Sequence, residues 1–231
     1  PLTESRVTDA QLRAQQFDKR YFPQSTEYNY VRVRAEVLHE SNINFSVRHF
    51  TSELKGEKYS PEVAAYGLVL AYTRAGKTEE AAETLAPLLK ADPDNLYLII
   101  AQAEVLAEQE KFDQAIALLE NKITTHPNHH PLNIRLAEIL MKAAKYKKAQ
   151  ALLSKHVERR PKDDYVWYLL AEVHGLAGNI YQVHVARAEY FLLNGLYDKA
   201  IIQLKNAQKL IEDDKYELSR LDVRLKEARK L

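Results

Sequence analysis

The chain has no cysteine and only six glycines among its 231 residues. Without cysteine it can form neither a disulfide nor a thiolate metal site. With so few glycines it lacks the turn residues that an all-β protein of this length needs. It also lacks an apolar run of about 20 residues, the length that a membrane-spanning helix requires. These absences favour a helical chain and leave its compartment open.

An excess of charge of either sign is absent as well. The chain carries 33 basic and 32 acidic residues, which gives a formal net charge of +1. Because the two signs are mixed along the chain, no broad positive field attracts nucleic acid or an anionic membrane. We therefore expect protein partners, no nucleic acid and no membrane insertion.

A period of 34 residues runs through the chain. Prolines follow it at Pro93, Pro127 and Pro161. Two alanine series keep the same step, namely Ala81, Ala115, Ala149 and Ala103, Ala137, Ala171. Small residues at the eighth and twentieth places and a closing proline are typical of tetratricopeptide repeats, each of which is a helical hairpin. The sequence thus predicts an all-α tetratricopeptide-repeat superhelix, an α-solenoid of antiparallel helix pairs, in which each repeat packs only on its sequence neighbours.

The register also predicts boundaries. Residues 1–22 are expected to form an N-terminal linker helix with few apolar anchors, which are Val7, Leu12 and Phe17. Residues 23–231 are expected to form the repeat domain. Its repeats are predicted at about 26–60, 62–95, 96–129, 130–163 and 164–212. A capping helix is predicted at 215–230, because its leucines share one face.

The period changes near the C-terminal end. Gly178 and Gly195 both fit the turn inside a hairpin, yet they are 17 residues apart, which is half a repeat. The motif continues in the new phase from Ala188 to Ala207. We therefore predict a half-repeat slip near residues 178–195, where one helix closes a hairpin and opens the next.

No arrangement of catalytic residues accompanies the repeats. His39 and Glu40 are followed by residues 41–43 with no second histidine, so the zinc-protease pattern H-E-x-x-H is incomplete. One histidine cluster lies in the loop HPNHHP, at His126, His129 and His130. Two prolines frame this loop and preclude the helical i, i+4 spacing of metal ligands, so we interpret the cluster as structural. We expect this chain to be no enzyme and to hold no cofactor.

The concave face of such an array, lined by the first helix of each repeat, is the candidate for function. The second and fifth places hold amphipathic or apolar side chains: Tyr66, Tyr97, Ile100, Ile134, Tyr165 and Tyr168. The ninth place holds an acidic series: Glu104, Glu138 and Glu172. Tyrosine is enriched at binding surfaces, so we predict that these side chains contact a protein partner. The alternative is that several of the first set pack against neighbouring helices and that the glutamates are only solvated.

A family resemblance adds to this prediction. The opening PLTESRVTDAQLRAQQF resembles the segment that follows the catalytic domain in periplasmic HEXXH zinc metalloproteases of the BepA (YfgC) type. The hairpins KTEEAAETLAPLLKADPDN and KFDQAIALLENKITTHPNHHPL are similar to the tetratricopeptide domain of that family. The resemblance covers the whole chain. It implies that the chain is the C-terminal, non-catalytic half and that the protease domain and its zinc lie upstream.

The same resemblance implies where such a chain works and on what. It implies a Gram-negative periplasm and a role in outer-membrane protein quality control. The expected partners are β-barrel precursors, the barrel assembly machinery and the chain's own protease domain. The alternative is a stand-alone repeat adaptor that scaffolds a multiprotein complex.

The substitution Ala137→Leu tests the predicted close packing. A leucine at the eighth place should overpack the contact between helices and lower the free energy of unfolding by about 1–3 kcal/mol. Urea unfolding followed by circular dichroism measures the change. An unaltered free energy of unfolding would contradict the predicted register.

Overall fold

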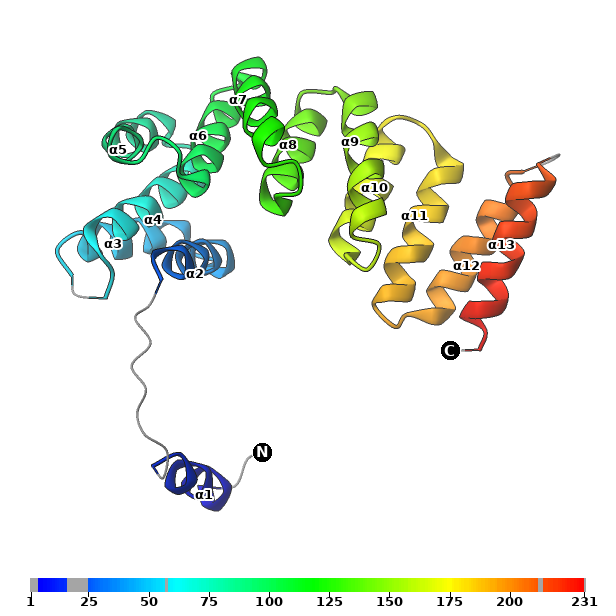
Figure 1. The fold of residues 1–231 in the computed structure, drawn as a ribbon, viewed down its shortest axis with the longest axis horizontal. Coiled ribbons are helices and arrows are strands. Elements are labelled where there is room, and N and C mark those ends of the chain that lie inside the picture. Colours follow the sequence, from blue (N-terminus) through cyan, green and yellow to red (C-terminus); the bar gives the residue numbers. More distant parts are fainter. Residues whose placement is uncertain (1–3, 16–24, 57, 212–213, 231) are drawn as a thin grey trace.

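The computed structural model of the chain is an arched array of antiparallel helices (Figure 1). The structure describes residues 4–15, 25–56, 58–211 and 214–230. Within these ranges the chain forms thirteen α-helices and no strand. The all-α superhelix that the 34-residue period predicts is confirmed.

From α4 on, successive helices pair as hairpins, whereas α2 and α3 both pack against α4. In the repeat register the first helices are α2 (Thr26–His39), α4 (Pro61–Arg74), α6 (Leu96–Glu108), α8 (His130–Lys142) and α10 (Asp164–Leu176). The second helices are α3 (Ile43–Glu53), α5 (Thr78–Ala91), α7 (Phe112–Thr125), α9 (Tyr146–Arg159) and α11 (Ile180–Leu193). The array ends with α12 (Tyr197–Gln208) and α13 (Lys215–Ala228). Helix α13 lies in the segment expected to cap the array, and it buries Leu221 and Leu225.

The N-terminal helix α1 (Glu4–Gln15) precedes the array. Two of its expected apolar anchors, Val7 and Leu12, are 43% and 53% exposed. The third, Phe17, lies outside the described residues. The two described anchors therefore do not hold α1 in the apolar core.

Local sequence sets the ends of the helices. Ser60, Asn95 and Asp163 each accept a backbone N–H of the helix that follows, which satisfies donors that the first turn leaves free. The periodic prolines come two residues after α5, α7 and α9 end, because proline cannot continue a helix. Caps and prolines thus place each first helix at the start of its repeat.

The turns inside the hairpins share one backbone geometry. A residue with positive φ follows the first helix in four repeats, at Gly76 (71°), Glu110 (59°), Ala144 (55°) and Gly178 (77°). The next N–H reaches back to the carbonyl five residues earlier, as from Lys77 to Tyr72 at 3.0 Å. This is the Schellman motif, which closes a helix with a left-handed residue. Its positions recur every 34 residues.

The same turn then appears half a period early. Gly195 has a φ of 70°, and the N–H of Leu196 donates to the carbonyl of Phe191 at 2.8 Å. Helix α11 therefore closes the hairpin with α10 and opens a hairpin with α12. The predicted half-repeat slip is confirmed.

The apolar core follows the predicted register but reaches further than expected. The series alanines Ala81, Ala103, Ala115, Ala137 and Ala149 are fully buried. However, the ring of Tyr30 on α2 stacks on Tyr97 of α6, with centroids 5.2 Å apart and an interplanar angle of 16°. The expectation that each repeat packs only on its sequence neighbours is wrong here. Helix α2 packs against α4, which brings Tyr30 to Tyr97 in the third repeat.

Gly67 on α4 lies where helices approach closely. A Cβ atom there would lie 2.4 Å from the ring of Phe50 and 2.8 Å from Val33. Gly67→Ala should therefore lower the free energy of unfolding by about 1–3 kcal/mol, although alanine is the better helix former. Gly175→Ala on α10 is the matched control, because its nearest heavy atom is 3.8 Å away. Chemical denaturation that gives equal effects for the two variants would contradict this packing.

Candidate functional site

Two adjoining cavities lie on the first helices. One has a volume of about 230 Å³ and is lined by residues of α2, α4, α6 and α8. The other has a volume of about 460 Å³ and is lined by residues of α6, α8 and α10. Both are lined by Glu104, Glu108 and Arg135, so we treat them as one surface and call it the concave groove. Within the described part of the chain, the residues that line it all belong to first helices.

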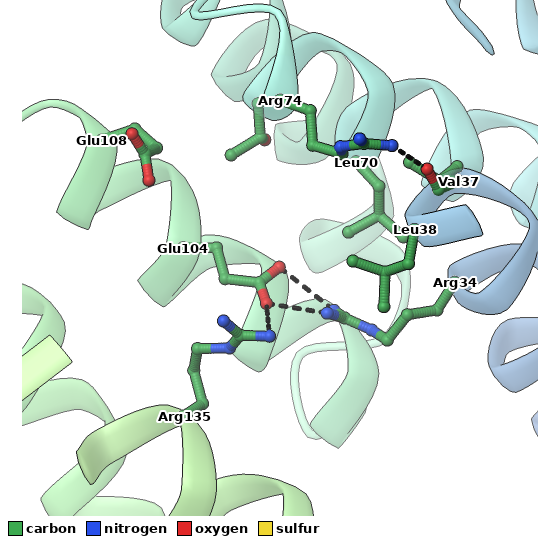
Figure 2. Close-up of a pocket in the computed structure, with 9 residues that line it drawn as sticks. Arg34, Val37, Leu38, Leu70, Arg74, Glu104, Glu108 and Arg135 are labelled. Carbon is green, nitrogen blue, oxygen red and sulfur yellow. Dashed lines mark hydrogen bonds and ion pairs between the residues drawn. The ribbon is translucent and has the colours of Figure 1, made fainter. Parts of the chain in front are cut away.

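Glu104 lies at the junction of the two cavities, between two arginines (Figure 2). Arg34 donates from Nη1 and Nη2 to the two carboxylate oxygens of Glu104, at 2.7 and 3.1 Å. Arg135 Nη2 lies 2.7 Å from Glu104 Oε1. The bidentate contact of Arg34 with Glu104 is of a kind that is among the stronger hydrogen-bonded ion pairs in proteins. The three residues come from α6, α2 and α8, so one carboxylate ties three repeats together.

The surroundings of Glu104 keep it charged. Its side chain is only 12% exposed. Burial alone would raise the pKa of Glu104, but the positive charges of Arg34 and Arg135 outweigh burial and hold that pKa below its usual value. Arg34 also donates from Nε to the hydroxyl of Tyr66 at 3.0 Å. Burial raises the pKa of Tyr66 to about 12, so its hydroxyl stays neutral.

Polar contacts continue from Glu104 toward α10. Arg135 Nη1 lies 2.6 Å from Glu138 Oε2, and the Tyr165 hydroxyl donates to Glu138 Oε1 at 2.7 Å. We call the series Arg34, Glu104, Arg135, Glu138 and Tyr165 the polar ladder. It runs along the groove and connects α2, α6, α8 and α10.

A tyrosine pair lies at the α10 end of the ladder. The rings of Tyr165 and Tyr168 stack with centroids 5.9 Å apart. The Tyr168 hydroxyl donates to Glu172 Oε1 at 2.8 Å. Tyr165 and Tyr168 are 44% and 41% exposed, so both rings offer apolar surface to a partner.

The predicted contact residues fall into three groups. Tyr66, Ile100 and Ile134 are buried, which corrects the prediction that they face a partner. At this place of the first helix the side chain faces the core, as the packing alternative predicted. Tyr97 is partly buried against Tyr30. The remaining five lie in or beside the groove, and their contact with a partner stays a prediction: Tyr165, Tyr168, Glu104, Glu138 and Glu172.

The sequence prediction missed the arginines. Arg34 stands in a series that continues at 34-residue steps as Leu68, Gln102, Leu136 and Leu170. A cation at a place that holds leucine in three of the other four repeats is a signal in the sequence, because a buried charge needs a partner. Arg135 gives no such signal, since arginine is common on helix surfaces.

The histidines of the loop HPNHHP have structural partners. A ring nitrogen of His129 accepts the N–H of Leu132 and so caps α8. His130 Nδ1 lies 2.9 Å from Nε2 of the buried His156. Burial lowers the pKa of both His130 and His156. Across the described ranges, no three His, Cys, Asp or Glu side chains are grouped so that they could hold a metal ion.

Comparisons of sequence identify tetratricopeptide repeats in the chain. Residues 66–129 and 106–173 match the tetratricopeptide repeat family. The beta-barrel assembly-enhancing protease of Escherichia coli (strain K12) is 30% identical over 237 residues, which covers 100% of this chain and 47% of that protein. The protein of the same name in Yersinia pestis is 28% identical over 232 residues, covering 100% of this chain and 48% of the relative. The chain thus spans about half the length of these relatives.

Solved structures resemble the fold. The type IV pilus biogenesis factor PilW has a TM-score of 0.58 at 16% identity, over 89% of this chain and 94% of PilW. A tetratricopeptide repeat protein from Parabacteroides merdae has a TM-score of 0.52 at 14% identity, over 98% and 93% of the two chains. At these identities the likeness shows the fold alone. Among the described helices, none is both long and apolar enough to span a membrane.

Glu104→Gln tests the centre of the groove. The depressed pKa means that ionised Glu104 stabilises the fold above the unfolded-state pKa of about 4.3, and that this contribution is lost as pH falls through the lower folded-state pKa. At pH 7 we expect the free energy of unfolding of the variant to be about 2–4 kcal/mol lower than that of the wild type, because two partly buried guanidinium groups lose their anion. As pH falls from the unfolded-state pKa through the lower folded-state pKa of Glu104, the wild type should lose stability more steeply than the variant.

Denaturant unfolding at neutral and acidic pH measures both effects. Glu172→Gln is the control, because this carboxylate is exposed and its removal should change the free energy of unfolding by under about 0.5 kcal/mol. If the two variants behave alike at pH 7, Glu104 does not tie the repeats together.

Proposed function

Because the chain belongs to the tetratricopeptide-repeat proteins and aligns over its whole length with a beta-barrel assembly-enhancing protease, we propose that it is the non-catalytic, protein-binding part of such a protease. In this function the concave groove binds polypeptide segments of outer-membrane β-barrel precursors and of the barrel assembly machinery. The site of action is the periplasm of a Gram-negative bacterium, and the process is outer-membrane protein quality control. The catalytic zinc belongs to a protease domain outside this chain.

The exposed tyrosine pair beside the larger cavity is the observation that carries this proposal. Apolar side chains of Met141, Leu169 and Leu176 line the same cavity. Unfolded barrel precursors expose the aromatic and apolar side chains that later face lipid, and this lining suits such side chains. Rings held by hydrogen bonds to Glu138 and Glu172 lose little freedom on binding, which favours affinity.

The length of the groove supports an extended ligand. Packed helices lie about 8–10 Å apart, so the first helices from α4 to α10 span roughly 30 Å. An extended chain rises about 3.3 Å per residue, which makes this distance equal to about nine residues. A transmembrane β-strand has about 9–11 residues. The groove is therefore of a size to hold one unpaired strand of a precursor.

Binding of an unfolded barrel protein to the 231-residue chain tests the proposal. A labelled outer-membrane β-barrel protein is diluted from urea into the chain, and fluorescence anisotropy reports binding. We expect saturable binding that the double variant Tyr165→Ala, Tyr168→Ala weakens about tenfold, because two exposed aromatic anchors are lost. Tyr97 is a poorer target, since its ring stacks on Tyr30.

Tyr28→Ala is the matched control. Tyr28 is 54% exposed on α2 and lines neither cavity, so this variant should bind as the wild type does. Circular dichroism establishes that each variant is folded. Absence of saturable binding, or an equal loss in the control, would contradict the proposal. Capture of only folded partners would instead favour the stand-alone adaptor.

A further inference from the structure

The charges that line the concave groove are unevenly distributed along it. The smaller cavity is lined by three cations, Arg34, Arg74 and Arg135, and by two carboxylates, Glu104 and Glu108. The larger cavity is lined by four carboxylates and two cations, namely Glu104, Glu108, Glu138, Glu172, Arg135 and Lys142. The groove is therefore balanced overall but positive toward α2 and α4 and negative toward α10.

The carboxylates of the larger cavity differ in how far they are neutralised. Glu104 is held by two arginines, and Glu138 by Arg135. Lys142 Nζ lies 2.5 Å from Glu108 Oε1. Glu172 accepts the Tyr168 hydroxyl, and within the described ranges no cation forms an ion pair with it. Glu172 is thus the carboxylate with charge left for a ligand.

Two exposed aromatic rings lie beside this charge. The Tyr168 hydroxyl donates a hydrogen bond to Glu172, the Tyr165 hydroxyl donates one to Glu138, and the two rings stack on each other. The hydrogen bond to Glu172 and the charge of Glu172 raise the pKa of Tyr168, which the nearby Arg187 partly offsets. Even with Arg187 counted, the carboxylates around the larger cavity outnumber the cations. A cation is attracted both to a carboxylate and to the face of a tyrosine ring.

We propose that Tyr165, Tyr168, Glu138 and Glu172 form a subsite for a lysine or arginine side chain of the segment bound in the groove. This inference rests on the proposed function and adds the chemistry that the groove selects. The stem of the basic side chain lies on the tyrosine rings while its charge meets Glu172. An apolar neighbour in the segment contacts Leu176, which is 53% exposed and lines the same cavity. An acidic residue at this position is disfavoured.

Three peptides of one alternating apolar and polar sequence test the subsite. Both ends are capped, and the central residue is arginine, glutamine or glutamate. Calorimetric titration of the 231-residue chain should give an affinity for the arginine peptide about fivefold above the glutamine peptide, with the glutamate peptide weakest. The preference should shrink at high salt, because the subsite is partly exposed.

A charge-reversal variant separates recognition from a structural role. Glu172→Lys should invert the order of the arginine and glutamate peptides, which loss of folding cannot do. The matched control is Glu83→Lys, since Glu83 is exposed on the second helix α5 and lines neither cavity. That variant should keep the wild-type order.

The outcomes distinguish the subsite from the groove itself. Equal affinities for the arginine and glutamine peptides, or an unchanged order in Glu172→Lys, overturn the subsite and leave groove binding in place. If no peptide binds and the unfolded barrel protein does not bind either, both proposals fail. Peptide binding that survives loss of Tyr165 and Tyr168 places the peptides elsewhere and also overturns the subsite.

Discussion

The carboxylate of Glu104, shared by Arg34 and Arg135, is the contact on which the groove depends. It joins α6 to α2 and α8, across 70 residues in one direction and 31 in the other. Because Arg135 is held there, it can also hold Glu138, which in turn accepts the hydroxyl of Tyr165. A continuous series of polar contacts thus connects an exposed ring on α10 with an ion pair two repeats away. The stack of Tyr30 on Tyr97 joins the same two helices, α2 and α6.

The fold and the site place different demands on the chain. The core requires small residues where helices approach, such as Ala137 and Gly67, and it tolerates little change in volume. The groove requires side chains that stay charged while partly buried, which only paired ions can do. A surface organised in advance by such pairs loses less conformational freedom on binding. The groove is therefore a candidate binding site, although the described part of the chain holds no cluster of metal ligands.

Much of the fold could be predicted from the sequence, because the residues that pack the helices recur at fixed places in each repeat. The 34-residue period predicts where the hairpins lie. Gly195 predicts where the slip lies, because the turn inside a hairpin needs a residue with positive φ, which favours glycine. The site was less predictable. Tyr66 and Tyr168 hold the same place in their repeats, yet Tyr66 is buried against α2 and Tyr168 is exposed beside Tyr190. The contact of Arg34 with Glu104 depends on the packing of α2 against α4 rather than against α3, which no single motif encodes.

Amide hydrogen exchange of the chain, alone and saturated with an unfolded barrel protein, tests the central claim most directly. The claim is that a polypeptide lies in a groove built only from first helices and centred on Glu104. The account predicts slower exchange in α6, α8 and α10 on binding, and unchanged exchange in α5, α7 and α9. Slowing confined to the second helices would contradict it.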